Sequence, residues 1–315
     1  MSTTEQMSDE ERAVRNGAGL VDRSERGKLA LSGGEAKRFL QGQVTQEVEA
    51  LQPGRGAYAA FLTAKGKMLG DLRVLDAGDE LLLDTERVAL QELFTMIRRF
   101  SIGFDAELHR RTLERGLLSL VGGQSRAVLG DAAGALGEAE HDHVVAAIDG
   151  IPARLIATDL GVDLLLDSAQ TEALKQALVA RGALPVSEES AEVVRVEHGR
   201  PRYGIDLDDA TIPQEAGLNE RAVSFTKGCY VGQETVARLY YKGKPNRRLC
   251  GLRLSEPVER GTELELGGKR VGVVGSVAAS PLHGPIALAL VRREAALGCV
   301  VTAGAARAEV VKLPF

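Results

Sequence analysis

A single cysteine in the stretch FTKGCYVGQETVARLY, residues 225–240, is the clearest candidate for chemistry in this chain of 315 residues. Cys229 lies among glycines and polar residues, whereas a core cysteine usually lies among aliphatic side chains. Lys227 and the backbone N–H groups of the glycine-rich turns favour the thiolate, which is the nucleophilic and metal-binding form. The stretch therefore predicts a reactive thiol. The alternative is a cysteine that only fills a small pocket.

The other candidate metal or redox ligands do not form a pattern. Cys250 and Cys299 lie in apolar, strand-like settings, and no two cysteines have the CxxC spacing of a zinc site or a redox pair. His141 and His143 fit one face of a strand, but no third ligand is near them in sequence, which favours a solvated loop. We therefore expect no metal site and a reducing, cytoplasmic location.

Charge and hydropathy exclude several classes of protein. The net charge of −5 argues against broad nucleic-acid binding, which normally needs a basic face. No stretch approaches the ~20 apolar residues that cross a bilayer. The first residues, MSTTEQMSDEERAV, are polar and acidic, so we expect neither a secretory signal nor a transit peptide.

Hydrophobic spacing predicts a mixed α+β body. Ser32 and Glu35 fit a capping box for a helix that runs to Pro53, and residues 57–62 and 68–75 are typical of strands. A Leu-rich strand, an Asp and an amphipathic helix occur twice, in DELLLDTERVALQELFTMI (79–97) and GVDLLLDSAQTEALKQALV (161–179). Another strand precedes each copy, so two related β-β-α units are expected.

The composition changes near residue 245. From there, short strands alternate with Gly and Pro turns, which is typical of a small β-barrel or sandwich. We expect three parts: a disordered tail at 1–16, an α+β body with the two related units at 17–244 and a C-terminal β-barrel at 245–315.

Three segments together resemble the YgfZ family of folate-binding proteins, relatives of the glycine-cleavage T-protein (aminomethyltransferase) and of a mitochondrial iron–sulfur assembly factor. They are YAAFLTAKGKMLGDLRV, RVEHGRPRYGIDLDDATIPQEAGL and FTKGCYVGQETVARL. The resemblance runs from about Gly19 to the C-terminus, and KGCYVGQE is its most specific part. It implies a pseudo-symmetric, T-protein-like cloverleaf around a central folate channel, followed by a C-terminal β-barrel.

The resemblance also assigns folate binding to the α+β body at 17–244 and implies residues for binding tetrahydrofolate or a derivative. In T-proteins the glutamate of Arg-x-Glu-x-Gly accepts the two parallel donors of the reduced pterin, and here that residue is Glu197. The alternative for this carboxylate is a salt bridge to Arg195 or Arg200. Tyr58 and Tyr203 fall in the matching segments and suit an aromatic wall.

The anionic glutamate tail of folate needs a cation, and the resemblance leaves the choice open between three places. These are Lys227, Arg238 and the basic loop at residues 242–248.

One departure from the T-proteins affects the expected activity. T-proteins carry paired aspartates in the first segment, whereas this chain has Gly70 and a single carboxylate, Asp71. Asp71 and Cys229 are the candidate catalytic residues, and glycine-cleavage activity is not expected.

The implied function is a tetrahydrofolate-binding protein that supports the assembly or repair of iron–sulfur clusters in client proteins. The alternatives are a folate-dependent aminomethyl or methyl transferase and a non-catalytic scaffold. Cys229 does not hold a cluster alone, because such clusters take about four thiolate ligands.

Overall fold

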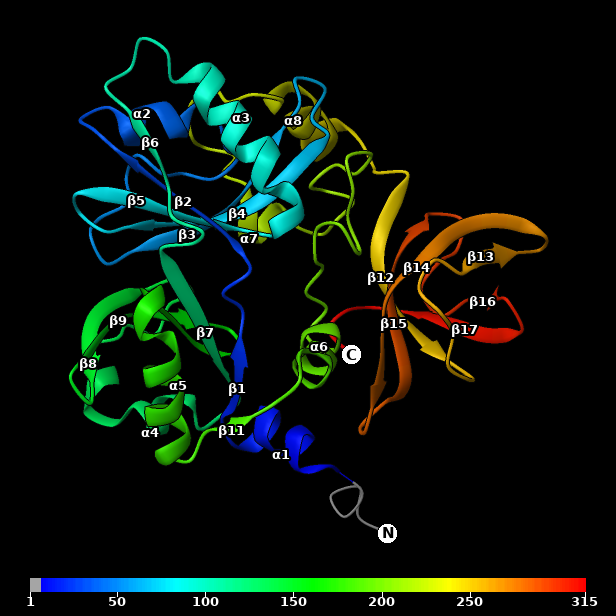
Figure 1. The fold of residues 1–315 in the computed structure, drawn as a ribbon. Coiled ribbons are helices and arrows are strands. Elements are labelled where there is room, and N and C mark those ends of the chain that lie inside the picture. Colours follow the sequence, from blue (N-terminus) through cyan, green and yellow to red (C-terminus); the bar gives the residue numbers. More distant parts are fainter. Residues whose placement is uncertain (1–6) are drawn as a thin grey trace.

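Two helix-covered sheets and a closed barrel make up the computed structural model, which describes residues 7–315. Figure 1 shows the two sheets one above the other, with the barrel beside them and helix α6 (Glu188–Glu197) between. This arrangement confirms the expected α+β class and the C-terminal barrel. No helix among residues 7–315 is long and apolar enough to cross a membrane.

The first sheet has five antiparallel strands in the order β3-β4-β5-β2-β6. The predicted strands at 57–62 and 68–75 are confirmed as β3 and β4. The bounds are Gly27–Ser32 (β2), Gly56–Leu62 (β3), Met68–Asp76 (β4), Glu80–Thr85 (β5) and Glu107–Arg110 (β6).

The second sheet has six strands in the order β11-β1-β7-β10-β9-β8, and only the edge pair β11–β1 is parallel. The bounds are Gly19–Asp22 (β1), Arg115–Val121 (β7), His143–Ile148 (β8), Ile151–Thr158 (β9), Gly161–Asp167 (β10) and Leu184–Pro185 (β11).

The predicted repeat is present. In the first copy β4 and β5 lead into α3 (Leu90–Phe100), and in the second β9 and β10 lead into α5 (Thr171–Ala180). A short 3-10 helix precedes each of these helices, at Arg87–Ala89 (η2) and Ser168–Gln170 (η4). The order β3-β4-β5-β2-β6 in one sheet corresponds to β8-β9-β10-β7-β1 in the other, so the body is pseudo-symmetric.

Six strands close the barrel in the order β12-β15-β14-β13-β16-β17. The bounds are Arg247–Leu254 (β12), Glu263–Leu266 (β13), Lys269–Ser280 (β14), Gly284–Arg292 (β15), Val300–Ala303 (β16) and Ala306–Val311 (β17). The remaining helices are short: Asp9–Asn16 (α1), Ala36–Gln41 (α2), Ser125–Leu129 (α4), Gly130–Ala133 (η3), Asn219–Ala222 (α7) and Gln233–Lys242 (α8).

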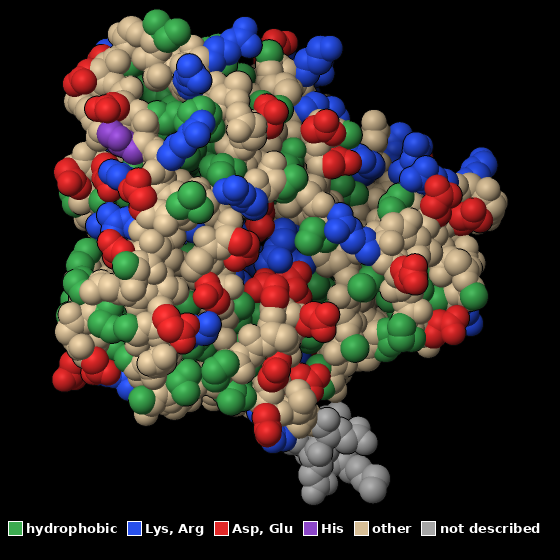
Figure 2. All heavy atoms as spheres, viewed as in Figure 1, with side chains coloured by type: hydrophobic (Ala, Val, Ile, Leu, Met, Phe, Trp, Pro, Cys, Tyr) green, Lys and Arg blue, Asp and Glu red, His purple; other side chains and the backbone are tan. Residues whose placement is uncertain are grey.

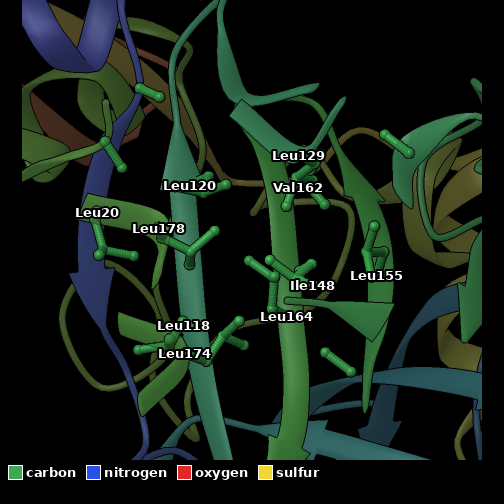
Figure 3. Packing of buried hydrophobic residues seen from close by; sticks show 14 of the residues in the cluster. Leu20, Leu118, Leu120, Leu129, Ile148, Leu155, Val162, Leu164, Leu174 and Leu178 are labelled. Atoms are coloured by element: carbon green, nitrogen blue, oxygen red, sulfur yellow. The ribbon is translucent and has the colours of Figure 1, made fainter. Parts of the chain in front are cut away.

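Alternation along the strands divides each sheet into a core face and a second face. In the six-stranded sheet, Leu118 and Leu120 of β7 lie beside Leu174 and Leu178 of α5, as Figure 3 shows, and Val162 of β10 lies beside Leu129 of α4. In the five-stranded sheet, an equivalent core contains Leu72 and other aliphatic and aromatic residues. Because side chains alternate between faces along a strand, polar residues of β4, β7 and β10 lie on the opposite faces. Those faces hold the candidate site.

Two expectations about helices are corrected. Within the tail expected to be disordered, residues 9–16 form α1, because Ser8 and Glu11 make a capping box and Val14 is buried. Residues 1–6 lie outside the described part. The helix expected to run from residue 36 to Pro53 ends at Gln41. The chain then turns so that the backbone N–H of Thr45 donates to Ala60 of β3.

Candidate functional site

A cavity of about 200 Å³ lies between the second faces of the two sheets. Its walls come from β3, β4 and β5 on one side, from β7, the β9–β10 turn and β10 on the other, and from residues 200–203 after α6. In Figure 2, acidic and basic side chains gather in a hollow near the middle of the molecule. The cavity is smaller than the ~300–1,000 Å³ typical of pockets for drug-sized ligands, so it suits one ring system.

Ion pairs fix most of the charged side chains around the cavity. Arg73 on β4 donates to Asp84 on β5 and to Asp163 on β10, each at 2.7 Å, and so joins the two sheets. Burial alone would raise the pKa of Asp84, but the guanidinium groups of Arg26 and Arg73 hold that pKa below its ordinary value. These arginines therefore build the walls and are not free to neutralise a ligand.

Asp71 differs from the other carboxylates of the cavity. Among the described acidic residues that line it, Asp71 alone makes no ion pair. It is 5% exposed, and its Oδ2 accepts a hydrogen bond of 2.7 Å from the hydroxyl of Tyr58. Burial raises the pKa of Asp71 to about 6, although the Tyr58 hydrogen bond opposes this rise. A buried carboxylate of this kind can accept a ligand N–H and can take up or release a proton near neutral pH.

The two predicted tyrosines also line the cavity. Desolvation and the neighbouring Asp71 raise the pKa of Tyr58 well above its ordinary value, so its hydroxyl remains a donor. Tyr203 is partly buried, and burial followed by Asp209 and Asp208 raises its pKa to about 12. The structure thus brings Asp71, Tyr58 and Tyr203 together.

Glu197 lies elsewhere. It is the last residue of α6 and is buried, and its Oε1 accepts hydrogen bonds of 2.5 Å from Arg15 of α1 and from Ser280 of β14. It does not line the central cavity, and its partner is neither Arg195 nor Arg200. Its role as a folate ligand stays a prediction, and its contacts hold α1, α6 and the barrel together.

Arg195 and Arg200 each have another acidic partner. Arg195 pairs with Glu192 and Asp206, and Arg200 pairs with Asp159 in the β9–β10 turn.

Lys227 anchors the loop that carries Cys229. Its Nζ donates to the backbone carbonyls of Gln41, Val44 and Gln46 at 2.6, 2.8 and 2.8 Å, which accounts for all three of its N–H groups. Burial lowers the pKa of Lys227 to about 8. With its hydrogens used in this way, Lys227 is not positioned to receive the tail of a folate.

Cys229 itself is exposed, and it follows a buried lysine and precedes the buried Tyr230. Gly232, with a φ of 84°, is the N-cap of α8, a left-handed conformation that glycine adopts without strain. The thiol therefore lies exposed on a loop fixed on both sides, and Cys229 does not line the central cavity. Cys250 is buried in the barrel, as expected, and Cys299 is partly buried.

The basic residues proposed for the folate tail lie outside the cavity as well. Arg238 is exposed on α8. The basic loop expected at residues 242–248 is only residues 243–246, and Arg247, the first residue of β12, pairs with Glu215 at 2.8 Å. Within residues 7–315 no group of three His, Cys, Asp or Glu side chains is arranged to hold a metal ion.

Sequence reasoning missed the arginines that build the cavity, Arg26, Arg73 and Arg221. Arg73 could have been predicted, because it lies two residues after Asp71 on the same strand, so that its side chain faces the same side of the sheet. Arg221 carried no comparable signal, since its partner Glu140 is distant in the chain.

Two family models match the chain. The first is described as the GCVT N-terminal domain and covers residues 1–227, and the second is the glycine cleavage T-protein C-terminal barrel domain at residues 247–315. Among solved structures, the aminomethyltransferase T of the glycine cleavage system from Bartonella henselae is similar with a TM-score of 0.85 and 27% identity. That match covers 97% of this chain and 88% of the other.

Curated relatives carry three kinds of name. An aminomethyltransferase from Rubrobacter xylanophilus is 31% identical over 97% of this chain and 85% of its own length. A putative chloroplastic transferase from Arabidopsis thaliana is 30% identical over 93% of this chain and 69% of its own. The tRNA-modifying protein YgfZ from Yersinia enterocolitica is 30% identical over 71% of this chain and 67% of its own.

Proposed function

Because this chain is a YgfZ-like member of the glycine cleavage T-protein family, we propose that it binds a reduced folate in the central cavity and supports iron–sulfur cluster assembly or repair in other enzymes. The observation that carries the first half is Asp71, a buried carboxylate without a cationic partner among the described residues, in a cavity whose other charges are paired. A reduced pterin presents N–H donors to such an acceptor. Tyr203 supplies an aromatic surface beside it.

The second half of the proposal concerns Cys229 and rests on the family resemblance together with its exposure. The thiol and the cavity are separate, so folate binding and thiol chemistry occupy different places. A single thiolate completes a cluster site only with ligands from a second molecule. The client protein would supply those ligands, and Cys229 would then be a transient ligand or a nucleophile toward the client.

Calorimetry with tetrahydrofolate and its 5-formyl derivative tests the folate half. The unaltered protein should bind in the micromolar range, and Asp71→Ala should weaken binding by about tenfold or more, because a ligand donor loses its buried acceptor. Cys229→Ser is the matched control and should bind as well as the unaltered protein. No heat of binding from either folate would refute the proposal.

Glu197→Gln belongs in the same series. Unchanged affinity in this variant would remove Glu197 from the ligand set and leave it a structural contact of Arg15 and Ser280.

Complementation tests the iron–sulfur half. In cells that lack the protein, Cys229→Ser should fail to restore the activity of iron–sulfur enzymes, whereas Cys299→Ser, at a partly buried thiol, should restore it. Restoration by Cys229→Ser would show that the thiol has no role in this function.

A further inference from the structure

His141 lines the central cavity but lies outside the network of arginine–carboxylate ion pairs described above. It lies between η3 and β8, is 9% exposed, and lines the cavity near Tyr58, with 6.4 Å between the two ring centroids. Neither ring nitrogen has a hydrogen-bond partner within the described residues. The solvated loop expected for this histidine is therefore wrong, since its ring is enclosed between the sheets.

Two local features of His141 are unfavourable in the absence of a ligand. Buried polar atoms are normally hydrogen-bonded, and both of its ring nitrogens are without a partner. Its φ of 73° is in the left-handed region, which residues other than glycine rarely adopt. Such features persist where the surrounding structure enforces them, and they cluster at ligand-binding sites.

The charge state of the imidazole follows from its surroundings. Burial, with Arg73 and Arg221 nearby, lowers the pKa of His141 to about 3, so the ring is neutral at physiological pH. Its Nε2 is 3.7 Å from Glu140, and a neutral imidazole forms no ion pair there. A neutral imidazole offers one N–H donor and one acceptor nitrogen.

Two other polar groups point to the same place. The guanidinium of Arg221 lies 5.2 Å from the centre of the Tyr58 ring, and its Nε is buried without a partner, although its Nη2 is bonded to Glu140. The Tyr58 hydroxyl holds one oxygen of Asp71. Around one tyrosine there are therefore a carboxylate, an unpaired guanidinium N–H and an unpaired imidazole.

We propose that His141 is a ligand-binding residue of the central cavity and that, with Arg221 and Asp71, it recognises the polar edge of a planar nitrogen heterocycle. Such an edge alternates ring N–H groups, carbonyl oxygens and ring nitrogens, and the three side chains supply matching donors and acceptors. This inference rests on the proposed folate binding, in which the heterocycle is the reduced pterin. It assigns the pterin ring to the end of the cavity that Tyr58, His141 and Arg221 line.

His143 provides a matched control from the same segment. Its Nδ1 is 2.9 Å from a guanidinium nitrogen of Arg154, and it does not line the cavity. Both histidines are buried, so any effect that arises only from loss of a buried imidazole should be common to the two.

The experiment measures ligand affinity and stability for the full chain and for His141→Phe, His141→Asn and His143→Phe. Calorimetry uses tetrahydrofolate and 5-formyl-tetrahydrofolate, and urea unfolding is followed without ligand. His141→Phe should lower the affinity about tenfold or more, because ligand atoms lose their partners. It should lower the urea midpoint only by the strain of phenylalanine at a left-handed backbone position, which asparagine relieves, because the lost nitrogens had no partners among the described residues.

His141→Asn should recover part of the affinity, because asparagine tolerates the left-handed backbone and keeps one donor and one acceptor group. His143→Phe should keep the full affinity and lower the urea midpoint, because Arg154 loses its contact.

The outcomes separate this inference from the proposed function. If the unaltered protein binds neither folate, the proposed function fails. If it binds and His141→Phe binds equally well, only the role of His141 is refuted. The same conclusion follows if His141→Phe lowers the urea midpoint and the affinity together while His141→Asn recovers neither, since His141 would then be a structural residue.

Discussion

Replacing Asp71 with asparagine should stabilise the folded protein, and the gain should grow with pH. Asparagine has nearly the same shape, and its Oδ1 can still accept the hydrogen bond from Tyr58. What the substitution removes is a buried negative charge that makes no ion pair within the part of the chain that the structure describes. Since burial raises the pKa of Asp71 from 3.8 to about 6, the folded state holds its proton more tightly than the unfolded state does. Stability from this group is therefore full below pH 3.8 and is lost as the pH rises through 6.

The size of the effect follows from the two pKa values. Their difference of about 2.2 corresponds to a penalty of about 3 kcal/mol at pH 8, where the carboxyl group is ionised in both states. At pH 5 most of the folded molecules retain the proton, and the penalty is about 1.6 kcal/mol. The advantage of Asp71→Asn over the unaltered protein should thus be larger at pH 8 by about 1.4 kcal/mol.

Urea unfolding of both proteins at pH 5 and pH 8, without folate, measures this difference, and other titrating groups cancel in the comparison. Asp84→Asn is the control from the same cavity. Arg26 and Arg73 keep the pKa of Asp84 below 3.8, so its stabilising contribution is complete at both pH values. That variant should be destabilised equally at pH 5 and pH 8. If Asp71→Asn shows the same pH-independent loss, the account of Asp71 as an unpaired buried charge is wrong.

Three further changes have defined expectations. Lys227→Met should lower the free energy of unfolding by about 2–3 kcal/mol, because three carbonyls lose their donor; an unchanged urea midpoint would contradict the anchoring role. Gly70→Asp should destabilise the protein, because a Cβ at this position would lie 2.6 Å from side-chain atoms of Phe61 and Ala89, and it should not produce aminomethyl transfer at a T-protein's rate. A stable variant that is active in a turnover assay with an aminomethyl-loaded carrier protein would contradict this. Iodoacetamide should label Cys229 before Cys250, whose thiol is buried with a raised pKa. Equal labelling rates by mass spectrometry would show that Cys229 is not a reactive thiol.

The repeat of the body could be predicted because its signal is local. A Leu-rich strand followed by an amphipathic helix is encoded within about twenty residues, and it occurs as expected in β5–α3 and β10–α5. The pairing of β1 with β7 carries no such signal, since β1 directly precedes β2 in the chain but belongs to the other sheet. Hydrophobic alternation predicts strands and their buried faces, but it does not specify which strands become neighbours.

The candidate site was predictable where its residues lie on strands that are neighbours both in the chain and in the sheet. Tyr58 and Asp71 lie on paired strands of one sheet, and the resemblance selects both. Glu197 and Lys227 differ, because their charges are satisfied by Arg15 and by carbonyls of residues 41–46, far away in sequence. His141 was missed because a histidine in a polar stretch has the same local pattern whether it is solvated or enclosed.

The double contact of Arg73 constrains how the ligand preference of this protein can evolve. The residues that hold the two halves of the body together also form the cavity wall, so a change at Arg73 alters the docking of the halves before it alters recognition. Within residues 7–315, Tyr203 and His141 make no ion pair that joins the halves, so mutation there should reshape the cavity lining while the docking stays intact. Divergence within such a duplicated body should therefore concentrate in its uncharged lining and spare its arginines.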